Sequence, residues 1–264
     1  MSSPLMRLLN VSRSVVPLAW RPTLRNLVFS VHPVTIVRPS GLRLRIADDT
    51  DWVHYTEIFR KGEYDSAIDR ALATIDDVEP VSIVDLGANV GFFTLRAVEK
   101  VRMRRAENTD VKIIAFEASE RSVDAFRARV IIDNELATHV RIVRGLVGNS
   151  AGTAIFYEGA SHGDSSLFTR GTSAGGTEIE FVDVSAQLAD EPTVHLIKCD
   201  IEGAELQFIR NFPDLLRKTR VGIFELHDDL CDTDECLRLL RACGFLHQAL
   251  IRRAGPYSVQ CVWR

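Results

Sequence analysis

The sequence predicts an α/β fold built on a mostly parallel sheet with helices on both faces. Short apolar runs alternate with helical patterns along most of the 264 residues, and this alternation is typical of a parallel sheet covered by helices. A glycine-containing turn joins the first run to a helix, and the last two runs form a hairpin. Seven strands are expected, at residues 81–85, 111–116, 140–146, 194–199, 221–226, 246–251 and 257–263.

The remaining elements follow from local patterns. Residues 34–47 alternate around Pro39-Ser40-Gly41, which predicts a β-hairpin. Residues 51–73 carry apolar side chains at helical spacing and predict one helix. Further helices are expected at residues 122–134 and 233–243. Because the last two strands form an antiparallel hairpin, we expect the sheet to end in one reversed strand.

An insertion interrupts the alternation of strands and helices. Two strand-like runs, at residues 153–157 and 178–182, flank a segment rich in glycine and serine at residues 159–176. This predicts a hairpin with a long tip, because loops of this length are uncommon unless they are functional or disordered. A substrate lid and a disordered surface loop both remain open. We therefore divide the chain into an N-terminal extension, residues 1–50, and a main domain, residues 51–264, with the insertion near residues 150–183.

The most informative turn spans residues 85–91 and reads Asp-Leu-Gly-Ala-Asn-Val-Gly. Glycines let the backbone approach a ligand, and the helix that follows offers free N–H groups. The glycines are spaced G-x-x-x-G, unlike the dinucleotide fingerprint G-x-G-x-x-G, and Asp85 stands at the strand end. Asp85 would repel a pyrophosphate but suits an ammonium group, so we expect S-adenosylmethionine as the cofactor. The alternative is an ordinary strand-to-helix turn.

Glu117 ends the next expected strand, one βα unit later. A carboxylate at this position can accept both hydroxyls of a ribose. This feature is shared by sites for S-adenosylmethionine and for NAD, so Glu117 supports a nucleoside cofactor without separating the two.

A second polar cluster follows the strand at residues 194–199. Lys198, Asp200 and Glu202 crowd the sheet edge where ligands bind in open α/β sheets. Acids at a helix N-terminus also favour the helix dipole, which accounts for Glu202 and Glu205 without any function. On the next strand, Glu225 is expected to be buried and to need a partner. His227 at its tip is a candidate general base, although structural histidines are common.

Composition excludes several classes of function. The net charge of -4 gives no global support for nucleic-acid binding. The five cysteines contain no CxxC pair, which favours a reduced, cytoplasmic setting. No apolar run reaches the ~20 residues of a membrane span.

Residues 1–30 are basic and partly apolar and contain no acid. They predict a helix packed on the domain or on a second subunit, or a peripheral membrane contact.

Taken in order, four motifs resemble the FkbM-type S-adenosylmethionine-dependent methyltransferases: D-L-G-A-N-V-G-F-F-T, F-E, K-C-D-I-E-G-A-E and E-L-H. The similarity runs from about Asp51 to the C-terminus. It implies a class I methyltransferase (Rossmann-like) fold, whose seven-stranded, mostly parallel sheet has one antiparallel strand. The expected activity is methyl transfer to a hydroxyl of a small molecule, such as a sugar, a glycolipid or a polyketide-type natural product.

The resemblance also implies which residues hold the cofactor. The methionine part is expected at the glycine turn and the ribose at Glu117. Where the family commonly has proline after F-E, this chain has Ala118, which is expected to alter the loop around the adenine. The cofactor-binding residues expected are Asp85, Gly87, Ala88, Asn89, Gly91, Phe92, Glu117 and Ala118.

The expected catalytic residues are Asp200, His227, Glu202 and Lys198. An aliphatic hydroxyl must lose its proton as it attacks, and Asp200 or His227 is the expected base, with Asp200 or Glu225 orienting the imidazole. A divalent metal held by Asp200, Glu202 and His227 is a less favoured variant, so no metal is predicted. An RNA or protein methyltransferase, a non-catalytic cofactor-binding protein and an NAD oxidoreductase are the competing functions. A homo-oligomer remains open.

Overall fold

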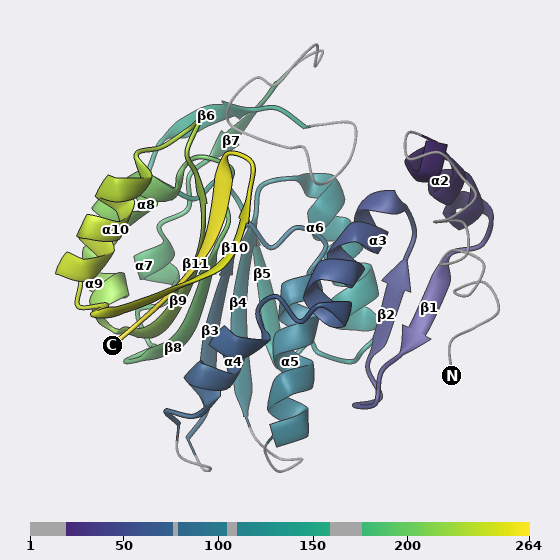
Figure 1. Ribbon diagram of the computed structural model, residues 1–264, viewed down its shortest axis with the longest axis horizontal. Helices are drawn as coiled ribbons and strands as arrows, with labels where there is room; N and C mark the ends of the chain where they lie inside the picture. Colours follow the sequence, from purple (N-terminus) through teal and green to yellow (C-terminus); the bar gives the residue numbers. More distant parts are fainter. Residues whose placement is uncertain (1–19, 76–78, 105–109, 159–175) are drawn as a thin grey trace.

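The computed structural model describes residues 20–75, 79–104, 110–158 and 176–264. Seven strands form one sheet with the order β10-β11-β9-β8-β3-β4-β5 (Figure 1). Their bounds are β3 Val81–Leu86, β4 Val111–Glu117, β5 Val140–Arg144, β8 Val194–Cys199, β9 Thr219–His227, β10 His247–Ala254 and β11 Tyr257–Trp263. The α/β class and the seven-stranded sheet are therefore confirmed.

The reversed strand is not at the end of the sheet. β11 pairs antiparallel with both β9 and β10, so it lies between them and β10 forms the edge. The other neighbouring pairs, β3 with β4 and β8, β4 with β5, and β8 with β9, are parallel. The hairpin was predicted correctly, but its second strand, β11, lies inside the sheet. In that position β11 is flanked by a strand on each edge and is buried.

Helices cover both faces of the sheet (Figure 1). One face carries α4 Asp65–Leu72, α5 Phe92–Arg104, α6 Glu120–Phe126 and the π-helical segment η3 Arg127–Ile132. The other carries α7 Val184–Gln187, α8 Glu205–Asn211, α9 Pro213–Arg217 and α10 Thr233–Ala242. Because both faces are covered, every residue of β3 and of β8 is buried.

The helix predicted at residues 51–73 is broken. The structure has α3 Asp49–His54, the π-helical segment η2 Tyr55–Arg60, and then α4 after a turn at Gly62. Gly62 has a φ of 67°, which a continuous helix cannot contain. After the break, Glu63 and Tyr64 lie near the sheet edge that carries the polar cluster.

The N-terminal extension contains α2 Arg21–Val31 and the hairpin β1 Val34–Val37 with β2 Arg43–Ile46. The predicted hairpin is confirmed, and its apolar residues Leu42, Leu44 and Ile46 join the same core as the sheet. The insertion forms the antiparallel pair β6 Thr153–Phe156 and β7 Thr177–Glu180. All of the predicted lid, residues 159–176, except Gly176 lies outside the described part of the chain, as do residues 1–19.

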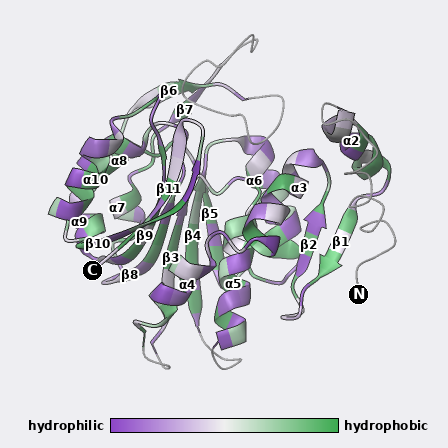
Figure 2. Cartoon of the chain, viewed as in Figure 1, coloured by the Kyte–Doolittle hydropathy of each residue, from purple (hydrophilic) through white to green (hydrophobic). Residues whose placement is uncertain are grey.

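Hydropathy follows this architecture, with the strands of the central sheet mostly apolar (Figure 2). None of the helices in the described ranges combines the length and the apolar character that crossing a bilayer requires.

Candidate active site

The glycine turn follows β3 and is clamped between two neighbouring strands. The N–H groups of Gly87 and Ala88 donate to the Phe116 carbonyl of β4, at 3.0 and 2.9 Å. On the other side the Asp200 carbonyl lies so close that a Cβ on Gly87 would stand 1.7 Å from its oxygen. Gly87 also has a φ of 70°. Glycine is therefore required here by both space and backbone conformation.

Glu117 ends β4, as predicted, and its carboxylate holds the glycine turn. Its carboxylate accepts hydrogen bonds from the N–H groups of Asn89, at 2.7 Å, and Ser119, at 2.8 Å. Burial raises the pKa of Glu117, while the two N–H donors oppose that shift. Each oxygen accepts one of these bonds and keeps acceptor capacity for a further hydroxyl donor.

Asp85 is fully buried at the end of β3. One carboxylate oxygen accepts the Thr94 hydroxyl at 2.8 Å. The other has no hydrogen-bond partner among the described residues, and the Lys198 ammonium lies 3.7 Å from it. Burial raises the pKa of Asp85, and the positive charge of Lys198 opposes this. A buried acceptor without a donor fits a site that a donating ligand completes.

Lys198 joins the tips of β3 and β8. Its ammonium donates to the Gly87 carbonyl at 2.7 Å and lies 3.3 Å from Asp200. Burial alone would lower the pKa of Lys198, but the charges of Asp200 and Asp85 raise it. Lys198 therefore stays protonated and positions the turn, so the structure gives no support for a proton-accepting role of this predicted catalytic residue.

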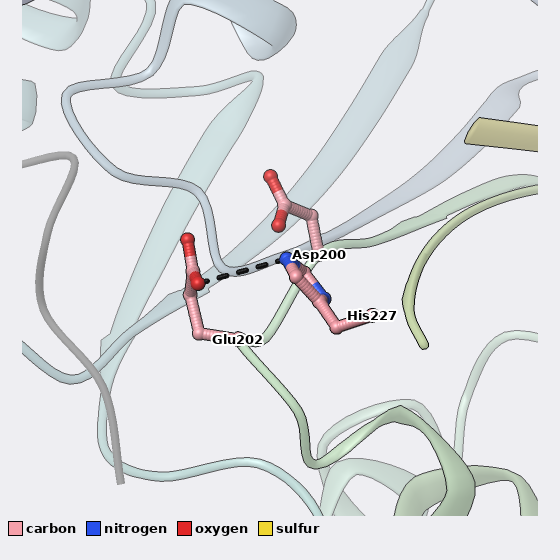
Figure 3. Close-up of side chains that lie close together, drawn as sticks. All are labelled: Asp200, Glu202 and His227. Atoms are coloured by element: carbon pink, nitrogen blue, oxygen red, sulfur yellow. Dashed lines mark ion pairs between the residues drawn. The ribbon is translucent and has the colours of Figure 1, made fainter. Parts of the chain in front are cut away.

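Asp200, Glu202 and His227 come together at the sheet edge, as the sequence predicted (Figure 3). One ligand-capable atom from each lies within 4.8 Å of the others. The Nε2 atom of His227 is 3.6 Å from Glu202 Oε2. Glu202 has a φ of 54°, a left-handed conformation unusual for a residue other than glycine. Oxygen ligands with one imidazole could accept a divalent metal.

The carboxylate that contacts the other imidazole nitrogen is Glu205, not Asp200 or Glu225 as expected. Glu205 Oε1 lies 3.2 Å from His227 Nδ1 and accepts the N–H groups of Ile201 and Gly203, each at 3.1 Å. Glu205 is fully buried. In the sequence, Glu205 is only an acid at the start of a helix. Its burial against the imidazole of His227 could not be predicted from that position.

His227 is surrounded by negative charge. Burial by itself lowers the pKa of His227, but the hydrogen bond and charge of Glu205, with the charges of Asp200 and Glu202, raise it to about 9. In the free protein at neutral pH the imidazole is therefore an imidazolium. A role as a base requires that this pKa fall when the site fills.

A second group of ionisable side chains borders the cluster. Burial and the charge of Asp200 raise the pKa of Glu225 to about 8, while Arg252 opposes the shift. Arg252, from β10, lies 2.9 Å from Glu63 and 3.8 Å from Glu225. Burial, followed by the charges of Glu225 and Asp200, raises the pKa of Tyr64. The sequence identified Glu225 but missed the ion pair that brings Glu63 beside it.

Three further residues predicted to bind the cofactor, Phe92, Ala118 and Gly91, make contacts within the protein. The Phe92 ring is buried in the core and packs edge-on against Phe59, with centroids 6.2 Å apart. The Ala118 carbonyl accepts the Arg144 guanidinium at 3.5 Å. Gly91 is required for packing, because a Cβ there would lie 2.5 Å from the Phe126 ring.

A cavity of about 400 Å³ opens beside the loops that follow β8 and β9. Gly203, next to Glu202, forms part of its wall, and three amide side chains, Asn149, Gln207 and Asn211, line it. Asn149 accepts hydrogen bonds from Gln207 at 2.6 Å and from Asn211 at 2.9 Å. Arg210, which pairs with Glu235, and the apolar residues Leu206 and Leu230 also line the cavity. This lining was not predicted, because its residues come from separate segments.

Comparison with known proteins identifies the family. A model of the methyltransferase FkbM domain matches residues 85–246. The solved structure of methyltransferase FkbM from Methylobacillus flagellatus KT is 16% identical, with a TM-score of 0.50, over 80% of this chain and 48% of that one. This chain thus spans about half the length of that protein.

Magnesium protoporphyrin IX methyltransferase from Synechocystis PCC 6803, solved with bound SAM, is 11% identical with a TM-score of 0.45, over 82% of this chain and 92% of that one. No curated protein matches the sequence. The domain match covers residues from the glycine turn to beyond α10, more than half of the chain. This chain belongs to the FkbM methyltransferase family.

Proposed function

We propose that the protein is an S-adenosylmethionine-dependent O-methyltransferase that acts on a hydroxyl of a small molecule. The observation that carries the proposal is the imidazole of His227, which the buried Glu205 holds at the sheet edge beside the glycine turn. An imidazole oriented by a carboxylate is a common form of general base.

The residues at the turn fit the expected cofactor. Asp85 offers a buried oxygen without a hydrogen-bond partner among the described residues, which suits an ammonium group. Glu117 keeps acceptor capacity for ribose hydroxyls. S-adenosylmethionine would supply an electrophilic methyl group when bound. We infer that Asp85 and the turn hold its methionine part and that Glu117 holds its ribose.

The protein's own task is then to position the acceptor and to take its proton. Positioning can lower the barrier by ~7–11 kcal/mol, and general-base help adds ~10²–10⁴-fold. Nε2 of His227 is the preferred proton acceptor, with Asp200 as the alternative. Positive charge brought beside Asp200 and Glu202 would lower the pKa of His227 from about 9. Glu205 would keep Nδ1 protonated throughout.

The acceptor is proposed to be a hydroxylated molecule such as a sugar, a glycolipid or a polyketide-type natural product. The amide-lined cavity beside Gly203 supports this class, since amide groups hydrogen-bond hydroxyls without requiring a charge. All five cysteines are free thiols, which supports a cytoplasmic location.

Calorimetric titration with S-adenosylhomocysteine, alongside NAD, tests the cofactor. We expect stoichiometric binding of S-adenosylhomocysteine alone, and binding weakened about tenfold or more in Asp85→Asn, through loss of one charged interaction. Glu180→Gln, exposed on β7, is the matched control. A folded protein that binds NAD or neither compound contradicts the proposal.

Transfer of a labelled methyl group to a panel of sugars, glycolipids and macrolides tests the reaction. Asp200→Asn and His227→Asn should each lower turnover, by about 10²-fold or more for the true base, with S-adenosylhomocysteine binding retained. Activity that survives exhaustive chelation eliminates the metal-assisted variant at Asp200, Glu202 and His227. Transfer to RNA or protein but to none of the small molecules would overturn the proposed acceptor class.

A further inference from the structure

Helix α2 exposes an apolar stripe. Trp20 at its N-cap, Leu24, Leu27 and Val31 are spaced four, three and four residues apart, which places them on one face. Their exposed fractions are 67%, 39%, 65% and 65%. Val37, on the neighbouring strand β1, is 68% exposed. The stripe belongs to the end of the molecule opposite α8 and α10, where Figure 2 colours much of α2 and β1 as hydrophobic.

The opposite face of α2 is fixed to the main domain. Phe29 is buried, and its ring centroid lies 6.2 Å from that of Trp52 on α3. Arg25 forms an ion pair with Asp49. The Asn26 side chain accepts the Asp49 N–H at 2.7 Å. These contacts set the rotation of the helix, so the exposed stripe cannot simply turn inward.

The charge of this region has one sign. No aspartate or glutamate occurs before Asp48, whereas the first 47 residues contain seven arginines: Arg7, Arg13, Arg21, Arg25, Arg38, Arg43 and Arg45. Arg43 pairs across the hairpin with Val37, and Arg45 with Thr35. All four of these residues are exposed. Arg25 and Arg38 pair with Asp49 and Glu99. Exposed apolar side chains and the exposed arginines Arg43 and Arg45 therefore both lie on the surface of the extension.

We propose that this surface, formed by Trp20, Leu24, Leu27, Val31, Val37, Arg43 and Arg45 and here named the basic-apolar face, binds the surface of an anionic lipid bilayer. Apolar side chains on one face of a helix enter the headgroup region, and arginines beside them attract anionic lipid phosphates. The tryptophan at the start of the stripe suits the interface between headgroups and acyl chains.

A second copy of the chain fits this face less well. A two-fold dimer brings the same surface of both subunits together. That arrangement would oppose two sets of arginines with no acid from the first 47 residues to pair them. An anionic bilayer supplies the missing negative charge, so the charge pattern favours lipid over self-association.

Sedimentation of the full chain with vesicles tests the proposal. We expect binding to vesicles of phosphatidylcholine mixed with phosphatidylglycerol, and little binding to phosphatidylcholine alone. The variant Leu24→Ser/Val31→Ser should bind the mixed vesicles about tenfold or more weakly, because each apolar group contributes through its buried area. Arg43→Gln/Arg45→Gln should lose about fivefold per arginine and show a weaker dependence on salt.

The control is Met103→Ser/Leu246→Ser, which removes two apolar side chains outside the face that are at least as exposed as Leu24 and should leave vesicle binding unchanged. S-adenosylhomocysteine binding and far-UV circular dichroism report folding in every variant. Equal binding of the Leu24→Ser/Val31→Ser variant and the wild type would overturn the proposal. The proposal would also be overturned if the wild type were a dimer that does not bind vesicles and this variant were a monomer. The face would then be a subunit interface.

Discussion

At the scale of single residues, the pair formed by Glu205 and His227 decides how protons are held in the site. Glu205 contributes both a hydrogen bond and a charge to the raised pKa of His227. The pair is buried, so water screens this interaction less than it would at the surface. Any base chemistry at His227 would therefore depend on a carboxylate that is itself fully buried.

Replacing Glu205 by glutamine should lower the pKa of His227 from about 9 toward its ordinary value of 6.5. The amide keeps a hydrogen-bond acceptor but removes the negative charge that stabilises the imidazolium. NMR titration of the imidazole measures this shift directly. Glu180→Gln should leave the midpoint unchanged, and a midpoint near 9 in Glu205→Gln would show that other groups hold the proton.

The pH dependence of stability follows from two raised pKa values. The pKa of His227 is about 9 when folded against 6.5, and that of Glu225 is about 8 against 4.5. Protons bound more tightly by the folded state stabilise it below the unfolded pKa, and this stabilisation is lost as the pH rises through the folded value. The free energy of unfolding should therefore fall between about pH 4.5 and 9, through Glu225 up to about pH 8 and through His227 above about pH 6.5.

Urea unfolding at several pH values measures this decline, to which each group contributes up to about 1.4 kcal/mol per pH unit. Glu225→Gln cannot release a proton, so it should flatten the decline up to pH 8 and leave the part due to His227. A variant whose slope matches that of the wild type would mean that Glu225 is already ionised at neutral pH.

At the scale of elements, the site is built from two strand-to-helix turns pressed against each other. The turn after β3 meets the loop after β8 at Gly87 and the Asp200 carbonyl. The second loop contains consecutive left-handed residues, Glu202 with a φ of 54° and Gly203 with 102°. Non-glycine residues in that region are strained and cluster at functional sites. The contact sets the distance between the proposed cofactor turn and the proposed base.

Gly87→Ala should destabilise the protein by well over the about 1–2 kcal/mol of a left-handed alanine. Its Cβ would overlap the Asp200 carbonyl, so one of the two turns must move. Gly255→Ala is the control, because Gly255 also has a positive φ, of 57°, but nothing lies within 4 Å of its Cβ. Chemical denaturation compares the two, and equal losses would show that the turns are not in contact in solution.

The sequence predicted the elements that depend on local pattern. Buried parallel strands are continuous apolar runs, and β8 begins and ends at the predicted residues. The antiparallel strand β11 also has the predicted bounds. The place of β11 inside the sheet depends on pairing with distant strands, which no local pattern specifies. The helix break at Gly62 was missed because the apolar spacing continues through it, and helical patterns tolerate single glycines.

The residues of the candidate site likewise include some that local sequence predicts and others that it does not. Asp85 and Glu117 stand at strand ends, and parallel strand ends meet at one edge, so their grouping was predictable. Glu205 was assigned to the helix dipole because an acid at a helix start is ordinary. Its burial against His227 depends on how α8 packs beside β9, and that is decided by tertiary contacts.

At the scale of the whole molecule, the N-terminal extension is continuous with the main domain. Leu42, Leu44 and Ile46 pack into the same core cluster as the sheet. Asp51 accepts the Ala47 N–H at 2.7 Å and pairs with Arg129 at 2.9 Å. Contacts of this kind connect the extension with α3 and η3. The division at residue 50 drawn from sequence composition is therefore not a division of the core.

Leu44→Ala should lower the free energy of unfolding by about 2–5 kcal/mol, because Leu44 is completely buried. If the extension and the sheet unfold together, tryptophan fluorescence and circular dichroism will report the same single transition. Its midpoint will shift to lower denaturant concentration in the variant. Val37→Ala, in the same hairpin but exposed, should change stability by no more than about 0.5 kcal/mol. A second, earlier transition in Leu44→Ala would mean that the extension unfolds alone. The basic-apolar face would then rest on a separately folding unit, whereas one transition fixes its orientation relative to the proposed active site.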